Sequence, residues 1–421
     1  MRKTARCSGG ALLIILLLSG CQTILTHVKA TKAMHDGRYE ESVALFQEVL
    51  KKNDNNAEAL KGLGETYLRM KKAPEAVAPL EKAHQLYPSD KVAGINLGLA
   101  YNMIGEHDKA LQVWRPYVEK EPDTNLSIVI RKQMTLALYK DAAQKAKEAL
   151  KNETALRAAL KASPGDPDTL AVTYFGDKGL TEQARPLQKA IAAMLITDLS
   201  KAQSLKVVER IRVQKLLEEL RLGGSGIVDK RTAPRVGRLI GAGKIVTGNM
   251  LTAGNDKMDV KGLLTNVPTG GEIGRQDAGG PVKEFFKIEK AIAFGILKDL
   301  GVQLSRKEEE TIGRYATQSY PGLLYFGEGL DAQDRGEWDK AIEIFQKCLK
   351  EDPTGPCAVA LLDAPSGGDV EASVDAAAMA NAMGTAQAED ASAAASSSGE
   401  PPSATRILIA LPSTRIEWVK S

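Results

Sequence analysis

The sequence predicts an α plus α/β protein: an N-terminal helical solenoid, a central α/β sheet domain, an isolated C-terminal helix pair and a disordered tail. Three observations predict this order. A block of 34 residues recurs near the N-terminus, the hydrophobic period changes after residue 168, and an Ala/Ser-rich tract fills the end of the chain. The 421 residues leave room for roughly two or three domains.

The charge distribution excludes a general attraction to nucleic acid. The formal net charge is +3, and Arg2, Lys3 and Arg6 are the only charged residues among the first twenty. The remaining 53 basic and 53 acidic side chains balance. Affinity for nucleic acid rests on basic side chains at phosphates, so we expect no nucleic-acid partner.

The N-terminus has the pattern of a secretory signal. Met1–Arg6 is basic, and Ala11–Leu18 is an apolar run much shorter than the roughly 20 residues that span a bilayer. The following Leu18–Cys21 segment, Leu-Ser-Gly-Cys, resembles the bacterial lipobox, which implies removal of residues 1–20 and acylation of Cys21. Gln22 stands where an inner-membrane retention signal has Asp, so the resemblance implies an outer-membrane lipoprotein facing the periplasm. The alternative is an ordinary signal peptide that happens to place a Cys there.

Two adjacent blocks, Ala57–Asp90 and Lys91–Thr124, align without a gap. They share small residues, large apolar residues and a final proline at the same offsets: Leu60, Leu63, Gly64, Tyr67, Ala76, Leu80, Ala83 and Pro88, and then Gly94, Leu97, Gly98, Tyr101, Ala110, Trp114, Tyr117 and Pro122. This spacing resembles the tetratricopeptide (TPR) family, in which each repeat is a pair of helices and Gly or Ala marks their close contacts. A weaker copy, Thr23–Asn56, completes three repeats within residues 21–124.

A fourth copy, Gly322–Gly355, lies far downstream, within a predicted helical segment at residues 306–360. Repeats of this kind bury their core by stacking. The fourth copy has no sequence neighbour to stack on, so we expect it to dock on the domain that precedes it.

The TPR resemblance implies a concave face lined by the first helix of each repeat. The residues predicted to bind a partner protein or peptide there are Lys61, Glu65, Arg69, Ile95, Leu99, Asn102 and Met103. The alternative is that they are solvated or stacking positions, with Lys61, Glu65 and Arg69 forming an ion ladder along one helix face.

Residues 125–165 read as a helical connector, and residues 166–305 as the sheet domain. The predicted strands are Thr169–Phe175, Leu205–Glu209, Lys244–Thr252, Met258–Asn266 and a short edge strand beginning at Gly271–Ile273. The predicted helices are Thr181–Ala202 with a Thr cap, Ile211–Leu222, Asp229–Gly241 capped by Asp229, and Val282–Leu300.

Five segments of this domain occur in a familiar order. They are Leu205–Arg210, Leu216–Leu220, Gly226–Asp229, Gly237–Ala242 and Ile245–Gly248. Together they resemble the CsgG family of secretion and envelope lipoproteins over roughly residues 168–305. The resemblance implies a tendency to form homo-oligomers and, for the curli member, a pore built from two long inserted hairpins. A membrane strand needs about 9–11 residues. The first hairpin here has a short polar tip, and residues 274–280, at the second insertion site, are polar and glycine-rich.

No catalytic, cofactor or metal site is predicted. The histidines at 27, 35, 84 and 107 all precede the sheet domain, which excludes a histidine-based catalytic triad within it. Gly237–Lys244 is one residue too long for a phosphate-binding loop and precedes a strand. Cys348 and Cys357 either form a disulfide in an oxidising compartment or are two small apolar residues on adjacent helices.

Residues 361–421 form a low-complexity tail that we expect to be mostly disordered. The combined features predict a non-enzymatic, outer-membrane-anchored periplasmic lipoprotein that recruits envelope proteins or peptides, as a scaffold or accessory in secretion or surface assembly. The alternative is a component of a CsgG-type oligomeric secretion channel.

Overall fold

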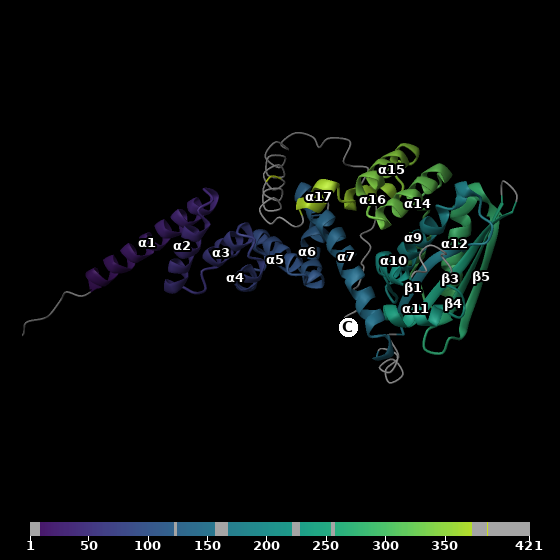
Figure 1. Cartoon of the computed structure of the whole chain (residues 1–421), viewed down its shortest axis with the longest axis horizontal. Coiled ribbons are helices and arrows are strands. Elements are labelled where there is room, and N and C mark those ends of the chain that lie inside the picture. The colour runs from purple at the N-terminus through teal and green to yellow at the C-terminus, as the bar shows by residue number, and fades with distance from the viewer. Residues whose placement is uncertain are drawn as a thin grey trace, which may run out of the picture. The chain divides into compact units, whose positions relative to one another are not determined.

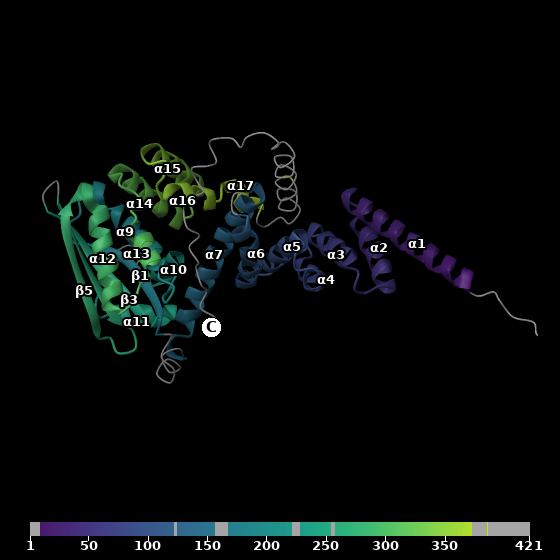
Figure 2. The same cartoon turned by 180° about the vertical axis from the view of Figure 1, so that it is seen from behind.

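The computed structural model describes residues 9–121, 124–155, 167–220, 228–253, 257–372 and 385, and side chains are described from Gln22 onward (Figures 1 and 2). The chain divides into two compact units. The first contains the residues up to Ala137 and the segment from Asp369, and the second contains Leu138–Gly368.

The first unit is a stack of paired helices. They are α1 (Gly9–His35), α2 (Tyr39–Lys52), α3 (Ala57–Arg69), α4 (Ala73–Leu86), α5 (Lys91–Met103), α6 (His107–Lys120) and the start of α7 (Asn125–Lys151). Each helix packs on its partner within the pair, and α2 on α3 and α4 on α5 join neighbouring pairs. The predicted N-terminal helical repeat region is therefore present. Of the helical connector predicted at residues 125–165, residues 156–165 lie outside the described residues.

Glycines allow the two helices of a repeat to approach closely. A Cβ atom added to Gly64 would lie 2.4 Å from Cγ of Leu80, and one added to Gly98 would lie 2.3 Å from Nε1 of Trp114. Asp90 begins α5 by accepting hydrogen bonds from two backbone N–H groups through its side chain. The aligned small and large positions thus contact each other across each helix pair.

The second unit contains a mixed five-stranded sheet in the order β2-β1-β3-β4-β5. Its strands are β1 (Thr169–Asp177), β2 (Lys206–Val207), β3 (Lys244–Ala253), β4 (Lys257–Asn266) and β5 (Glu272–Pro281). β1 is parallel to both β2 and β3, whereas β3, β4 and β5 are antiparallel neighbours.

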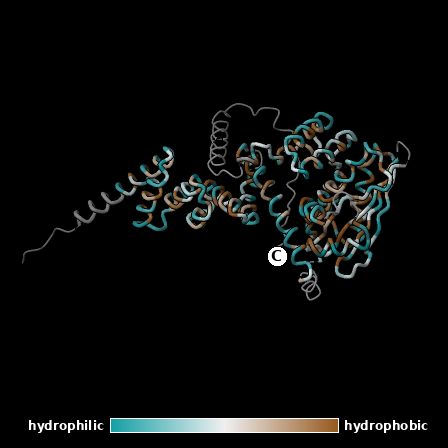
Figure 3. Tube along the Cα trace, in the orientation of Figure 1, coloured by the Kyte–Doolittle hydropathy of each residue, from teal (hydrophilic) through white to brown (hydrophobic). Residues whose placement is uncertain are grey.

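Helices cover both faces of this sheet. The helices of the domain are α9 (Leu187–Leu199), α10 (Arg210–Glu219), α11 (Ala233–Ile240) and α12 (Phe285–Asp299). Alternate β1 side chains belong to different cores: Leu170 and Val172 pack with α9 and α12, and Ala171 packs with α10 and α11. Figure 3 shows hydrophobic and hydrophilic stretches interspersed along the helices and strands of both units.

Several predicted boundaries were wrong. The edge strand is β5, ten residues long, and it includes the glycine-rich residues 274–280 because its backbone pairs with β4 from Lys257↔Pro281 to Thr265↔Glu272. The helix predicted from Thr181 starts as the short 3₁₀ helix η1 (Glu182–Ala184), and the Thr181 side chain makes no capping hydrogen bond. Asp229 accepts backbone hydrogen bonds in the turn before α11 rather than at its first residue.

Four helices follow α12 in the second unit. They are α13 (Arg306–Gly313), α14 (Tyr320–Asp334), α15 (Trp338–Glu351) and α16 (Cys357–Asp363). Among them, α14 packs on α9. Leu323, Phe326 and Leu330 of α14 share one core with Leu187 and Leu195 of α9. The expectation that the isolated fourth repeat docks on the preceding domain is therefore confirmed.

The predicted low-complexity tail begins with helical residues. α16 extends into it, and α17 (Gly367–Ala372) follows, with Asp369 3.1 Å from Nζ of Lys132 within the first unit. Apart from residue 385, the tail beyond residue 372 lies outside the described residues. None of the helices that the structure describes is both long and apolar enough to span a membrane.

Candidate functional site

The predicted partner-binding face of the repeats is made of residues that contact one another. Nζ of Lys61, on α3, lies 2.9 Å from Glu58 and 2.8 Å from Asp90, the residue that caps α5. Burial opposes the charge of Lys61, but the hydrogen bonds to Asp90 and Glu58 outweigh it and raise the pKa of the amine. Lys61 therefore links two successive repeats, and 19% of its side chain is exposed.

Glu65 and Arg69 form the second charged element of this face. Nε and Nη2 of Arg69 donate to Oε1 of Glu65 at 3.1 and 2.9 Å, one helical turn apart. Their side chains are only 19% and 14% exposed. A partner that contacts this pair would meet a carboxylate and a guanidinium that already neutralise each other.

The predicted positions on α5 lie deeper. Ile95 and Leu99 are buried in the repeat stack, and Met103 is half-buried. Oδ1 of Asn102 lies 2.8 Å from Nδ1 of His107, while Nδ2 of Asn102 is buried without a hydrogen-bond partner among the described residues. Recognition by Ile95 or Leu99 would require these side chains to leave the core. The binding role of the seven residues stays a prediction.

The predicted lipidation site lies at the edge of what the structure describes. Cys21 falls within the bounds of α1, in the part whose side chains are not described, and residues 1–8 of the predicted signal peptide lie outside the described residues. Acylation of Cys21 likewise stays a prediction.

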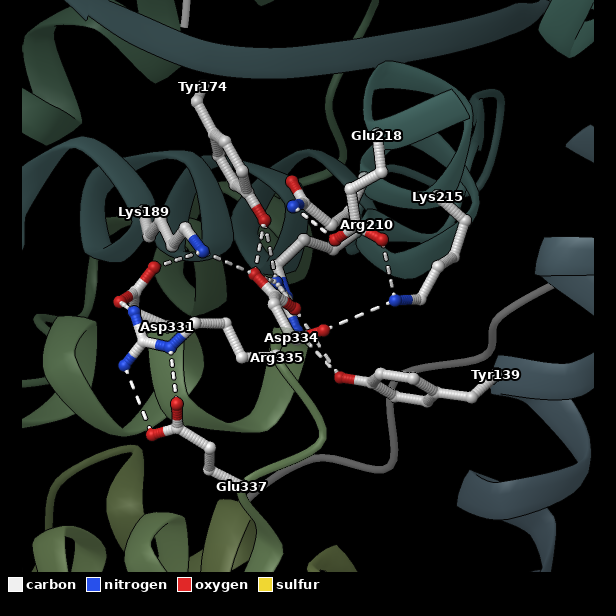
Figure 4. A network of polar contacts seen from close by, with 11 residues as sticks. Tyr139, Tyr174, Lys189, Arg210, Lys215, Glu218, Asp331, Asp334, Arg335 and Glu337 are labelled. Atoms are coloured by element: carbon white, nitrogen blue, oxygen red, sulfur yellow. Dashed lines mark hydrogen bonds and ion pairs between the residues drawn. The ribbon is translucent and has the colours of Figure 1, made fainter. Parts of the chain in front are cut away.

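A second candidate site, missed by sequence reasoning, surrounds Asp334 at the C-terminal end of α14 (Figure 4). The side chains of Tyr174 from β1, Lys189 from α9, Arg210 from α10 and Tyr139 from α7 all point toward its carboxylate. Only 1% of the Asp334 side chain is exposed. The site therefore brings one end of the docked repeat into contact with four elements of the same unit.

The carboxylate of Asp334 accepts several hydrogen bonds from charged and polar donors. Nη1 of Arg210 donates to Oδ1 and Oδ2 at 2.7 and 2.9 Å. Nζ of Lys189 and the hydroxyl of Tyr174 donate to Oδ2 at 2.7 and 2.8 Å. The Tyr174 hydroxyl also accepts from Arg210 at 2.8 Å, which fixes its orientation.

Neighbouring ion pairs extend this network outward. Lys215 donates to the backbone carbonyl of Asp334 at 3.2 Å and to Glu218 at 2.7 Å. Lys189 also pairs with Asp331 at 2.6 Å, and Asp331 pairs with Arg335. The buried charges are thus compensated, as the interior of a protein requires.

The electrostatics favour a charged Asp334 carboxylate and neutral tyrosine hydroxyls. Burial raises the pKa of the Asp334 carboxyl, but the charges of Arg210 and Lys189 outweigh burial and hold that pKa below its usual range. Burial raises the pKa of the Tyr139 and Tyr174 hydroxyls. General acid–base catalysis uses a group that titrates near the working pH, and none of these does.

The arrangement therefore joins the end of α14 to β1, α9, α10 and α7 through buried hydrogen bonds and ion pairs. Within the described ranges, no group of three or more His, Cys, Asp or Glu side chains could hold a metal ion. Arg210 and Asp334 are 124 residues apart, and no pattern in a single sequence pairs them. The one available signal was the position of Arg210 inside a segment that resembles the CsgG family.

A disulfide links the second helix of the docked repeat to the helix that follows it. Cys348 in α15 and Cys357 at the start of α16 are bonded, with their Cα atoms 6.1 Å apart. Both side chains are buried. Of the two alternatives that the sequence left open for these cysteines, the structure contains the disulfide.

Comparison with known protein families agrees with this architecture. Residues 151–259 match the family model of the curli production assembly/transport component CsgG. Residues 33–81 and 332–356 match tetratricopeptide repeat models. The chain combines a CsgG domain with tetratricopeptide repeats. The match to CsgG ends within β4, so β5 and α12 of the CsgG domain lie beyond it.

Solved structures with similar helices are distant from this chain. MamA AMB-1 is 14% identical, and the match covers 52% of this chain and 91% of that chain with a TM-score of 0.27. A tetratricopeptide repeat protein from Parabacteroides merdae is 11% identical over 84% and 98%, with a TM-score of 0.26. A Thermobaculum terrenum O-GlcNAc transferase mutant is 18% identical over 47% and 40%, with a TM-score of 0.25. At such TM-scores these similarities carry no argument about function.

No protein of curated function matches the chain. Tetratricopeptide repeats bind protein partners, and the chain is accordingly a TPR interaction scaffold that carries a CsgG-like domain.

Proposed function

We propose that this protein is an outer-membrane-anchored periplasmic lipoprotein that recruits envelope proteins for secretion or surface assembly. The observation that carries the proposal is the order of its parts. A lipobox-like Leu18–Cys21 segment stands directly before the repeats, and a CsgG domain follows them. The lipid would hold the chain at the membrane, and the repeats would bind the partner.

The disulfide supports an extracytoplasmic location. Disulfides persist in the bacterial periplasm and are rare in the cytosol, where thiols are kept reduced. Cys348, in the docked repeat, and Cys357, at the start of the helix that follows it, are bonded and buried. An exported chain accounts for this bond more simply than a cytosolic one.

A role without catalysis fits the polar network around Asp334. The buried network around Asp334 is charge-compensated and joins α14 to the CsgG domain. Its carboxylate is engaged by Arg210 and Lys189, which leaves it poorly suited to act as a base.

A CsgG-type secretion channel is the second candidate function, favoured by the CsgG match itself. The family resemblance implies that inserted hairpins build the pore of the curli member. Here β3, β4 and β5 pair with each other over ten-residue lengths within the sheet, and α12 packs on β4 and β5. Because these strands already form the sheet, we favour the scaffold. Reproducible large conductances from purified protein in planar bilayers would establish the channel instead.

The lipid anchor has a direct test. We expect Cys21→Ala to abolish incorporation of labelled fatty acid and to release the protein from sedimented membranes. Firm anchoring by a lipoprotein needs more than one acyl chain, because a single chain binds only marginally. Continued membrane association of Cys21→Ala after a carbonate wash would reject the lipid anchor.

A further inference from the structure

The first helix carries an exposed apolar surface directly after Cys21. Ile24, Leu25 and Val28 are 68%, 55% and 56% exposed, and we call these three side chains the α1 patch. They lie within four residues of each other, so they form one contiguous strip of the helix. Scattered exposed apolar residues need no explanation, but a contiguous strip indicates a binding surface.

The opposite side of α1 is already used by the first repeat. Ala30, Ala33 and Met34 are buried, and Phe46 of α2 contacts the ring of His27. The terminal helix of a repeat stack normally presents a polar outer face, because no further repeat covers it. The α1 patch departs from that rule, which indicates that something outside the stack covers it.

The charges beside the α1 patch show which surface it fits. Lys29, Lys32 and His35 are exposed on the same helix, and no acidic residue precedes Asp36 in the sequence. An apolar strip whose own helix carries basic and no acidic side chains from residue 22 to residue 35 is complementary to the anionic surface of a membrane, where lysines reach the headgroups.

We propose that the α1 patch inserts into the surface of an anionic phospholipid membrane and orients the repeat stack on it. The inference rests on the proposed lipoprotein function, because acylated Cys21 would hold the patch at the bilayer. Val28 lies seven residues after Cys21, about 10 Å along the helix. The α1 patch therefore lies within two helical turns of the residue that would carry the lipid.

A second copy of the chain fits the α1 patch less well. Symmetric pairing of two patches would bring Lys29, Lys32 and His35 of both copies together, with no acidic side chain from residues 22–35 to compensate them. A lipid surface supplies both the apolar interior and the negative charge.

The test measures membrane binding by the α1 patch in a protein that carries no lipid anchor. The chain beginning at residue 21 with Cys21→Ser is mixed with vesicles of phosphatidylglycerol and phosphatidylcholine, and bound protein is measured by sedimentation. We expect Ile24→Ser with Leu25→Ser and Val28→Ser to weaken vesicle binding by roughly a hundredfold, because three apolar side chains are lost from the interface. Pure phosphatidylcholine vesicles should bind the parent chain more weakly than the mixed ones.

A matched control substitutes three other exposed apolar residues. Leu86, Tyr87 and Ile104 are 38%, 60% and 38% exposed at helix ends, and their replacement by Ser should leave vesicle binding unchanged. Circular dichroism melting of each variant verifies that the repeats remain folded.

Two results would overturn the proposal. One is equal vesicle binding, or no binding, by the parent chain and the triple patch variant. The other is a parent chain that dimerises by light scattering and becomes monomeric in the triple patch variant without binding vesicles, which would assign the patch to a second copy. Neither result bears on whether Cys21 is acylated, because the Cys21→Ala fractionation tests that separately.

Discussion

The same repeat occurs in this chain in two different environments. In the N-terminal stack, Gly64 contacts Leu80 and Gly98 contacts Trp114 across each helix pair. In the C-terminal pair, Gly329 contacts Phe345 in the same way. The internal geometry is shared, but the C-terminal pair packs on a sheet domain through a buried ion network and carries a disulfide.

The difference shows what the repeat pattern does and does not determine. Small and large residues at fixed offsets specify how two helices pack on each other. They do not specify the outer surface of the pair, which stacks on a like repeat in one case and on α9 in the other. Docking on an unlike domain requires contacts with a defined geometry, and the hydrogen-bonded charges around Asp334 supply them.

The largest expected effect comes from breaking that ion network. Asp334→Ala leaves Arg210 and Lys189 without their shared carboxylate in a site that is 1% exposed. Removing one partner of a buried ion pair costs about 3–5 kcal/mol. We expect a loss of this size in urea unfolding followed by circular dichroism.

Asp331→Ala is the matched control for Asp334→Ala. Asp331 also pairs with Lys189, but its side chain is 39% exposed, so the loss should stay below about 1 kcal/mol.

The pKa of Asp334 is lowered in the folded state, so the stability that this carboxylate contributes is present above its unfolded pKa and disappears as pH falls through the folded pKa. The difference between wild type and Asp334→Ala should therefore shrink in acid. Equal losses from both variants at neutral pH would contradict the docking role.

The disulfide is expected to have the next largest effect. It closes a loop between residues nine apart, and a cross-link of this length stabilises a fold by roughly 2–3 kcal/mol in the loop-entropy model. We expect Cys348→Ala with Cys357→Ala to lose about this amount in the same urea unfolding measurement. Reduced wild type should lose a similar amount, and the double variant should not respond to the reductant. Wild-type stability that is insensitive to reduction would count against the cross-link.

Close packing of α14 on the CsgG domain should give a smaller effect. A Cβ atom at Gly327 would lie 2.1 Å from the backbone carbonyl oxygen of Pro186, which cannot turn aside as a side chain could. We expect Gly327→Ala to cost about 1–3 kcal/mol through this overpacking. At Gly313 the nearest atom, Cζ of Phe294, is 4.0 Å away, so Gly313→Ala should be neutral or slightly stabilising. No loss of stability in Gly327→Ala would mean that α14 can move away from the Pro186 backbone at no cost.

Features with a local cause were predictable from the sequence. The strand Thr169–Phe175 was found as the core of β1 because a run of apolar and β-branched residues is typical of a strand buried on both faces. The glycine contacts of Gly64 and Gly98 followed from their offsets, because two recurrences at one spacing are unlikely to arise by chance.

Features with a non-local cause were not predictable. β5 contains three polar and three small residues in Arg275–Gly280, and only its pairing with β4 makes this segment a strand. Asp334 reads as the last residue of an ordinary helix, and its role depends on Arg210, which lies 124 residues earlier. The predicted partner-binding face was inferred from helix position alone, which does not reveal that Lys61 already pairs with Asp90.

The smallest expected effect on stability concerns Lys61 and Arg69. These residues also give the sharpest test of the contrast between the N-terminal stack and the C-terminal pair. If the N-terminal stack binds partners through this face, Lys61→Gln with Arg69→Gln should remove partners from pull-downs of the acylated protein. Stability should fall by no more than about 1 kcal/mol, because these ion pairs remain partly solvated. Lys52→Gln with Lys109→Gln is the matched control: it removes two cations from second helices, 41% and 54% exposed, and should leave the pull-down unchanged. If Lys61 and Arg69 only link α3 to its neighbours, Lys61→Gln with Arg69→Gln should lose the same stability but keep every partner in the pull-down. The N-terminal stack would then resemble the C-terminal pair, with its charges serving packing rather than recognition.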